Sequence, residues 1–239
     1  MEKVKLFYQM AVADTVADIT IYGDITSWPW MESDVSAYLL SRKLAELDPA
    51  VTRINVFINS YGGEVAEGLA IYNALRRHPA EVVTYCDGFA CSAASVIFMA
   101  GSKRVMNNSS LLMIHNAWSS ARGNAKDMRK AADDLDIITG ASINAYLDNC
   151  GGKIEQEKLV ELMDAETWLT PEDAITYGFA TEIDTANQSV SAPSQSVRDT
   201  IMQKMITSTM QAEKPAETPA NEQLTPFNRL FAAFLMSKN

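Results

Sequence analysis

The sequence predicts an α/β protein in which mainly parallel strands are layered with helices. Short runs of β-branched and apolar residues alternate with longer helical segments along the first 184 residues. One such run, residues 53–58, is nearly continuous, as expected for a strand that is buried on both faces of a sheet. Strands that alternate with helices in this way are typical of a layered core with parallel pairing.

Four segments are predicted to be strands because β-branched residues are enriched in them and turn residues follow them. In chain order, the predicted strands cover residues 19–23, 53–58, 82–86 and 111–114. Helical segments separate them, and serine, proline and glycine residues mark several of the helix ends. In chain order, the predicted helices cover residues 33–47 (with Ser33 as the cap), 65–77, 93–100 and 126–149, and another begins near Pro171.

A change of composition divides the chain near Asp184. Aromatic residues stop at Phe179 and do not return until Phe227, and Ser, Thr, Gln, Ala, Glu and Pro dominate the interval. Such a segment buries too little apolar surface to offset its ordering entropy. We therefore predict a folded domain over residues 1–184, a polar linker over 185–222 with a marginal helix at 197–210, and an amphipathic tail helix over 223–239.

The overall composition excludes several classes of partner. The formal net charge is −10, which argues against nucleic acid or an anionic membrane as the main partner, because both require a basic surface. No run of about 18 uncharged apolar residues is present, so no spanning helix is expected. The early apolar run is too short for a signal peptide. The three cysteines are sparse and odd in number, which favours a reducing compartment such as the cytoplasm.

A glycine turn, residues 59–63, separates a predicted buried strand from a helix. Gly62 and Gly63 allow positive φ and a close approach of another chain. The amides of such a turn suit an anion or a developing oxyanion. A simple tight turn between strand and helix is the alternative interpretation.

Ser92 follows a predicted strand and precedes a short, almost uncharged helix. At this junction its Oγ would lie beside the Ala93 N–H, which has no acceptor within the helix. A nucleophile with an oxyanion donor directly after it is what acyl transfer requires. Ser92 as a plain N-cap is the alternative. Ser95 is a second candidate nucleophile, but within the helix its hydroxyl is expected to bond the preceding turn.

The base for such a serine has to be one of only two histidines in the chain. His78 lies at an evident helix end, beside Pro79, and is most simply a solvated cap. His115 closes an apolar strand and is therefore the better general base. A structural histidine at a strand end is the alternative interpretation.

A carboxylate should orient the base, and Asp164 and Glu166 are both suitable. The two residues would share a face if this segment were extended. The sequence does not separate them, and either or both can also be solvated. Two histidines and scattered cysteines offer no metal-ligand cluster, so no metal or cofactor is expected.

Taken together, these motifs resemble those of the Clp-type (ClpP-like) serine peptidases over about residues 15–184. The family motif Asn-Ser-Pro-Gly-Gly corresponds to residues 59–63, with Tyr61 in place of the proline. The motifs Gly-x-Ala-Ala-Ser-Met-Gly and Met-Ile-His place Ser92 and His115 at the nucleophile and base positions. The family's usual aspartate corresponds to Glu166, with Asp164 as the second choice.

The resemblance implies a curved ββα superhelix of the ClpP/crotonase type, in which residues 126–149 form a protruding handle helix on which rings of subunits stack. It implies that the Gly63 and Ala93 amides hold the oxyanion. It also implies that the turn at Tyr61 and Gly62 and the strand after Ser110 bind substrate as an added strand. Energy from ATP, if it is needed, would come from a separate unfoldase.

Three features are most similar to the phage and prophage branch of the family, whose members are assigned as head-maturation (prohead) proteases. They are Tyr61, the stretch 166–170 and the polar tail. The expected substrate is then a capsid protein, in the host cytoplasm or the assembling prohead. The alternatives are a general Clp-type proteolytic subunit, a crotonase-like acyl-CoA enzyme and a non-catalytic assembly protein.

Overall fold

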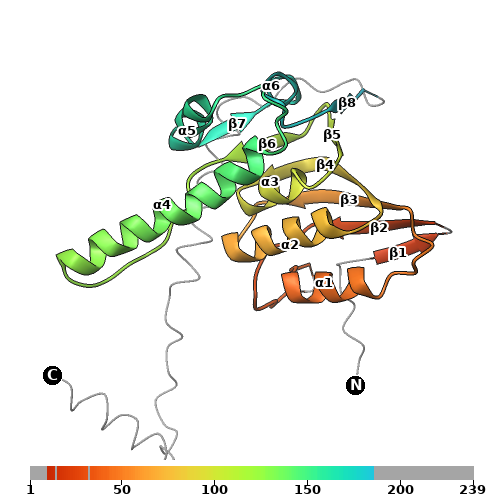
Figure 1. Ribbon diagram of the computed structural model, residues 1–239, viewed down its shortest axis with the longest axis horizontal. Coiled ribbons are helices and arrows are strands. Elements are labelled where there is room, and N and C mark those ends of the chain that lie inside the picture. The colour runs from red at the N-terminus through yellow and green to blue at the C-terminus, as the bar shows by residue number, and fades with distance from the viewer. Residues whose placement is uncertain (1–9, 14, 32, 186–239) are drawn as a thin grey trace, which may run out of the picture. The chain divides into compact units, whose positions relative to one another are not determined.

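A computed structural model describes residues 10–13, 15–31 and 33–185, which form a sheet with helices packed on it (Figure 1). The predicted helices at 197–210 and 223–239, and all of the predicted linker except residue 185, lie outside the described residues. No helix in the described ranges is long and apolar enough to cross a membrane.

The strands of the described residues belong to one mixed sheet. They are β1 (Met10–Ala13), β2 (Val16–Ile21), β3 (Arg53–Ser60), β4 (Glu81–Cys91), β5 (Lys103–Asn107), β6 (Leu111–Ile114), β7 (Thr167–Leu169) and β8 (Glu182–Asp184). The main path has the order β1-β2-β3-β4-β5-β8, and only β1 pairs with its neighbour in antiparallel fashion. A branch from β4 adds β6 in parallel and then β7 antiparallel. The predicted α/β class is confirmed.

The helices connect these strands in an alternating order. They are α1 (Ala37–Ala45), α2 (Val65–Arg77), α3 (Ala93–Phe98), α4 (Ala125–Leu147), α5 (Gln156–Asp164) and α6 (Pro171–Tyr177). The predicted bounds of α2 are confirmed. The predicted start of α1 at Ser33 is wrong, because Ser36 is the residue whose side chain caps the helix by accepting from the Leu39 N–H.

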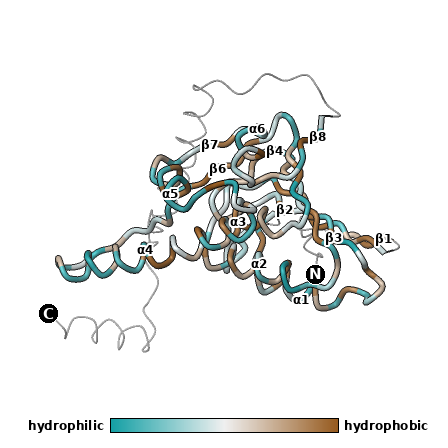
Figure 2. The backbone as a smooth tube through the Cα atoms, turned by 45° about the horizontal axis from the view of Figure 1, so that its top comes forward, coloured by the Kyte–Doolittle hydropathy of each residue, from teal (hydrophilic) through white to brown (hydrophobic). Residues whose placement is uncertain are grey.

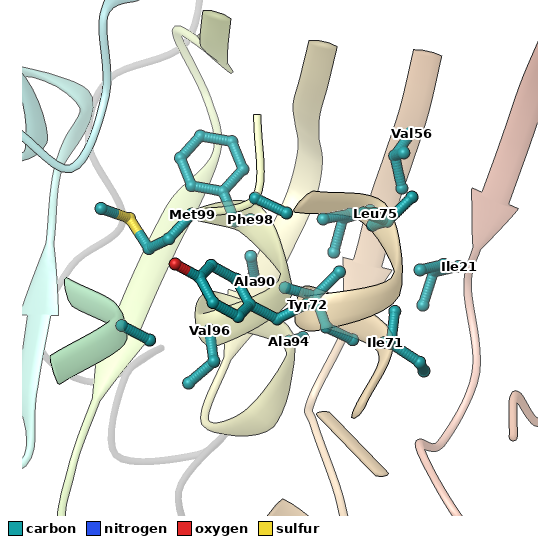
Figure 3. Close-up of a cluster of buried hydrophobic side chains, with 14 of the residues drawn as sticks. Ile21, Val56, Ile71, Tyr72, Leu75, Ala90, Ala94, Val96, Phe98 and Met99 are labelled. Carbon is teal, nitrogen blue, oxygen red and sulfur yellow. The ribbon is translucent and has the colours of Figure 1, made fainter. Parts of the chain in front are cut away.

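One face of the sheet packs against helices to form the core. Along β3, buried residues alternate with more exposed ones, so the expectation that residues 53–58 are buried on both faces of the sheet is wrong. Figure 3 shows Ile71 and Leu75 of α2 pointing toward Ile21 and Val56 of the sheet, and all four side chains are completely buried. Each buried Ile or Leu contributes about 1.5–3 kcal/mol relative to an exposed one, so this layer fixes α2 against the sheet.

β4 bends near its end, and the bend positions the site. Ile58 of β3 pairs with Cys86, but Ser60 pairs with Ala90, so β4 carries two extra residues between these pairs. The Phe89 N–H donates to Asn59 Oδ1 at 3.1 Å. A Cβ on Gly88 would lie 2.6 Å from the same oxygen, so a larger residue there would displace the Asn59 side chain from this hydrogen bond. The bulge moves the end of β4 away from β5 and onto β6.

α4 is the longest helix of the described part, and its first half extends beyond the sheet (Figure 1). Most residues from 125 to 138 are exposed, and Figure 2 colours most of this outer part as hydrophilic. The buried residues Ser142, Ala145 and Tyr146 all lie in the second half, which packs on the domain. The role of this helix as a ring-stacking handle stays a prediction.

Candidate active site

Ser92 lies between β4 and α3 in a backbone conformation that residues with side chains rarely adopt. Its φ is 54° and its ψ is −125°, and holding such a conformation costs on the order of 1–3 kcal/mol. The backbone bond from the Ser92 N–H to the Met113 carbonyl, at 2.9 Å, holds the turn against β6. The Ser92 side chain makes no capping hydrogen bond to α3. The N-cap interpretation of this hydroxyl is therefore wrong.

The Ser92 hydroxyl instead meets the histidine that the sequence favours. Ser92 Oγ and His115 Nε2 are 2.8 Å apart, which is hydrogen-bond distance. His115 follows β6, and β6 pairs with the end of β4 from which Ser92 emerges. His78, in contrast, lies at the end of α2, where its Nδ1 accepts from the Ala80 N–H.

Burial sets the protonation state of His115. Burial lowers the pKa of His115 below its ordinary value, and the negative charge of Glu166 opposes this by raising it. The net shift is downward, so the imidazole is neutral at physiological pH. A neutral imidazole can accept the proton of a serine hydroxyl.

The two candidate carboxylates have different surroundings. Asp164 ends α5 and accepts a hydrogen bond from Asn116 Nδ2 at 2.7 Å. Ile114, the last residue of β6, pairs in antiparallel register with Thr167, the first residue of β7, so His115 and Glu166 are the next residues along the two chains. The segment is not extended at this point, because Glu166 has a φ of 48°. Among the described residues no hydrogen bond joins the imidazole to either carboxylate, but Glu166 is the charge that acts on His115.

The glycine turn packs directly against the serine. The φ values of Gly62 and Gly63 are 99° and 145°, in the range that favours glycine. A Cβ on Gly62 would lie 2.6 Å from the Cys91 carbonyl oxygen and 2.8 Å from Ser92 Cβ. The turn therefore requires glycine both for its φ and for its close approach to Ser92.

Backbone hydrogen bonds between the glycine turn and Ile25 leave the Gly63 N–H pointing away from Ile25. Ile25 bonds to the Gly62 carbonyl and to the Glu64 N–H, at 2.9 and 2.8 Å, on either side of Gly63. In such a parallel bridge the N–H of the central residue points to the opposite edge. The Gly62 N–H already donates to Ser60 Oγ at 3.1 Å. Of the two glycine amides, that of Gly63 is thus the one suited to an oxyanion.

The expectation that the strand after Ser110 binds substrate as an added strand is wrong. That strand is β6, and both of its edges are occupied, since Leu112 pairs with Ala90 of β4 and with Leu169 of β7. A strand with two partners has no free backbone groups for a third. Tyr61, the other predicted contact, is half-exposed and lies against Phe89, with ring centroids 5.8 Å apart.

Ser95 has a structural role, as its helical position predicts. It is completely buried, and its Oγ donates to the Ser92 carbonyl at 2.6 Å. Because this bond uses the only hydroxyl proton of Ser95, Tyr146 is the donor in the 2.8 Å contact between the two hydroxyls. Tyr146 was not anticipated, and nothing in the sequence spacing relates it to Ser92. The same holds for Asn116. Gly88 was expected to follow the predicted strand 82–86, but β4 extends to Cys91 and contains it.

No group of three or more His, Cys, Asp or Glu side chains that could hold a metal ion occurs in the described ranges. All three cysteines are free and buried. Burial raises the pKa of the Cys86 thiol to about 12, so this thiol stays protonated and carries no nucleophilic role.

A parallel sheet with a strained serine at a strand–helix junction, hydrogen bonded to a histidine from the adjoining strand, is the arrangement used by serine hydrolases. The family model described as Clp protease matches residues 9–187. The chain belongs to the Clp protease family.

Several curated proteins are similar to this chain in sequence, and each is named an ATP-dependent Clp protease proteolytic subunit. The protein of Deinococcus radiodurans is 36% identical over 132 residues, which cover 54% of this chain and 64% of that protein. A Bacteroides fragilis protein is 32% identical over 154 residues, covering 63% of this chain and 73% of that protein. Subunit 1 of Prochlorococcus marinus is 33% identical over 127 residues, covering 52% and 64%. The chain thus spans less than two thirds of the Deinococcus and Prochlorococcus proteins.

Proposed function

We propose that this chain is a serine peptidase that hydrolyses peptide bonds through Ser92 and His115. The observation that carries the proposal is the 2.8 Å contact between Ser92 Oγ and His115 Nε2 at a strained strand–helix junction. Membership in the Clp protease family supports the same reaction.

In the proposed mechanism, Ser92 Oγ attacks the carbonyl carbon of the scissile bond while His115 Nε2 takes the hydroxyl proton. The protonated imidazole then gives this proton to the leaving amine, and a water molecule hydrolyses the acyl-enzyme by the same steps. Glu166 stabilises the imidazolium by its charge. The amides of Gly63 and Ala93 stabilise the oxyanion, and loss of one such donor typically costs about 10²–10³ in rate.

The decisive experiment replaces the nucleophile. We expect Ser92→Ala to fold and assemble normally but to lose peptide cleavage and labelling by a fluorophosphonate probe. Ser109→Ala, a change at an exposed serine near β6, is the matched control and should keep both. Full turnover by Ser92→Ala would overturn the proposal. Turnover of an acyl-CoA without probe labelling would favour a crotonase-like enzyme. A wild-type protein that neither cleaves peptides nor reacts with the probe would favour a non-catalytic assembly protein.

The relatives are named proteolytic subunits of an ATP-dependent Clp protease, which supports a proteolytic subunit that works with a separate ATPase, and we place that work in the cytoplasm. We propose the same for this chain, since its sequence contains no G-x-x-x-x-G-K-[ST] motif for nucleotide phosphates. We also propose that copies of the chain assemble into rings that stack through α4. Ile137 and Ile138 on this helix are exposed at 74% and 41%, and apolar side chains on a protruding helix are suited to contacts between subunits.

A second proposal concerns the natural substrate. The tyrosine at position 61, the stretch from Glu166 to Thr170 and the polar extension favour the phage head-maturation branch, in which a capsid protein is cleaved. The test is incubation with a candidate capsid protein, followed by mass spectrometry. Discrete cleavage without ATP supports this role, whereas degradation of unfolded proteins only with an added ATPase supports the general Clp-type role.

A further inference from the structure

The segment between β2 and α1 presents three large apolar side chains to solvent. Trp28, Trp30 and Met31 are exposed at 71%, 83% and 68%. We call residues 27–31 the tryptophan loop. Contiguous exposed apolar side chains are uncommon on soluble domains and mark sites that bind another molecule.

Hydrogen bonds fix the backbone of the tryptophan loop at both ends. At its start, Thr26 Oγ1, the Ser27 N–H and Ser27 Oγ all donate to Glu64 Oε1 at 3.0–3.2 Å. At its end, the N–H groups of Trp30 and Met31 donate to Asp34 Oδ2 at 2.9 and 2.8 Å. The loop therefore holds its aromatic side chains outward on an ordered backbone, and does not bury them.

The anchor of this loop is part of the active-site turn. Glu64 directly follows Gly63, and Ile25, two residues before the loop, bridges Gly63 through two backbone hydrogen bonds. Burial raises the pKa of Glu64, but the hydrogen bonds from Ser27 and Thr26 outweigh it and shift the pKa downward. The carboxylate is thus charged at neutral pH and is a strong acceptor.

The topology places the loop at the edge of the sheet where the site lies. β2, β3 and β4 are parallel, so the tryptophan loop, the glycine turn and Ser92 all follow the carboxyl ends of neighbouring strands. Ligands of open α/β sheets bind at this edge.

We propose that the tryptophan loop is a substrate-binding rim, in which Trp28 and Trp30 contact large apolar side chains of a polypeptide substrate outside the scissile bond. The inference rests on the proposed peptidase function and deepens it. Its basis is the continuity of the loop with the oxyanion turn, through Ile25 and Glu64, which fixes the loop backbone beside that turn. A second copy of the chain is the competing occupant.

The test compares two peptides with the same residues at the scissile bond, flanked further out by leucine and phenylalanine in one and by serine in the other. We expect Trp28→Ala/Trp30→Ala to raise KM for the apolar-flanked peptide about tenfold, with kcat and the serine-flanked peptide unchanged. Tyr38→Ala, which removes an aromatic ring that is 69% exposed on α1, is the control and should leave both values unchanged. An equal change in KM for both peptides, or no change for either, would overturn the inference. A change in the oligomeric state alone, measured by sedimentation, would also overturn it.

A binding measurement separates this inference from the proposed chemistry. In a Ser92→Ala background, the Kd of each fluorescently labelled peptide is measured by anisotropy with and without the tryptophan substitutions. We expect the protein with both tryptophans to bind the apolar-flanked peptide with a Kd about tenfold lower than that of the serine-flanked peptide. This difference should disappear when both tryptophans are replaced, whether or not the wild-type chain cleaves peptides. Glu64→Gln, which weakens the anchor, should reduce the same preference by about threefold. If the preference for the apolar-flanked peptide survives the double substitution, the proposal that the tryptophan loop binds substrate is wrong. If the wild-type chain cleaves no peptide, only the proposed peptidase function is wrong.

Discussion

Ser92 and Glu166 have φ values of 54° and 48°, and they are the only non-glycine residues with positive φ in the described ranges. Each conformation costs on the order of 1–3 kcal/mol and persists only where the surroundings impose it. For Ser92 the constraint is its bond to Met113, and for Glu166 it is the bond from its N–H to the Met163 carbonyl at 3.1 Å. Both strained residues act on His115, one by contact and one by charge, which concentrates the strain where the chemistry is proposed.

The pH dependence of cleavage should report the environment of His115. Burial lowers the pKa of His115 below its ordinary value of 6.5, so we expect kcat/KM to rise with pH through a value below 6.5 and then to level off. Glu166→Gln removes a charge that raises this pKa. The acid limb should therefore move to still lower pH, while the plateau falls by about 10²-fold or more because the imidazolium loses its counter-charge. The measurement is a pH profile of kcat/KM for both proteins.

Asp164→Asn is the matched control for that profile. Its carboxylate bonds Asn116 and does not act on His115, so the acid limb should stay in place. A downward shift in Asp164→Asn, with none in Glu166→Gln, would assign the third position to Asp164.

At the scale of elements, the turn between β3 and α2 has no tolerance for a side chain at Gly62. Gly62→Ala places a methyl group against the Cys91 carbonyl and Ser92 Cβ, and adds an alanine at a φ of 99°. We expect the free energy of unfolding to fall by about 1–3 kcal/mol and probe labelling of Ser92 to drop sharply. Urea unfolding and labelling rates measure the two effects. Gly140→Ala, at a helical position with open space around it, should raise the free energy of unfolding by about 0.5–1 kcal/mol, because alanine favours the helix, and should leave labelling unchanged.

Arg104 on β5 ties the last elements to the sheet. Its buried guanidinium donates to four carbonyls, those of Phe179, Gly178, Gly101 and Asn149, at 2.7–3.1 Å. Arg104→Ala leaves these acceptors without their donors, and we expect it to lower the free energy of unfolding by about 3 kcal/mol. Arg104→Lys supplies fewer donors and should lose about half as much. Denaturant unfolding distinguishes the three proteins, and equal stability of all three would contradict this role.

The elements differ in how far sequence patterns could predict them. α2 was predicted to the residue because Gly62-Gly63 and Pro79 bound it on both sides. The helix after β2 was started too early because Ser33 and Ser36 offer the same cap chemistry, and only tertiary context selects one. β5 was missed because it begins with lysine and arginine and contains only two adjacent apolar residues, Val105 and Met106. The sequences of α5 and of the three-residue strands β7 and β8 are too short or too polar to show a recognisable hydrophobic period.

The residues of the candidate site could be proposed from the sequence, but their geometry could not. Residue type and position single out Ser92 and His115, since the chain has few histidines and one small-residue strand–helix junction of this kind. The contact between them depends on the bulge in β4, of which the sequence shows only Gly88. The choice between Asp164 and Glu166 depends on the register of β7 on β6, which no local pattern encodes.

At the scale of the whole molecule, the exposed half of α4 is where association is expected. Ile137→Asp places a charge among apolar side chains that we propose to be buried between copies of the chain. We expect the assembly to dissociate at about tenfold higher protein concentration or more, as measured by sedimentation velocity. Lys126→Asp changes the charge of the same helix near its exposed start and should have a smaller effect. An unchanged sedimentation profile for Ile137→Asp would exclude α4 as the contact.

The pairing of β4 with β6 has a consequence for how the gene can vary. Ser92 and His115 follow adjacent strands that are aligned with Cys91 opposite Met113. Substitutions that keep the apolar pattern of the two strands leave this register in place. A single codon lost from the turn at 108–110 is different, because it would slide β6 by one position and turn His115 to the other side of the sheet. The length of this short turn, more than its composition, is what the protein has to preserve.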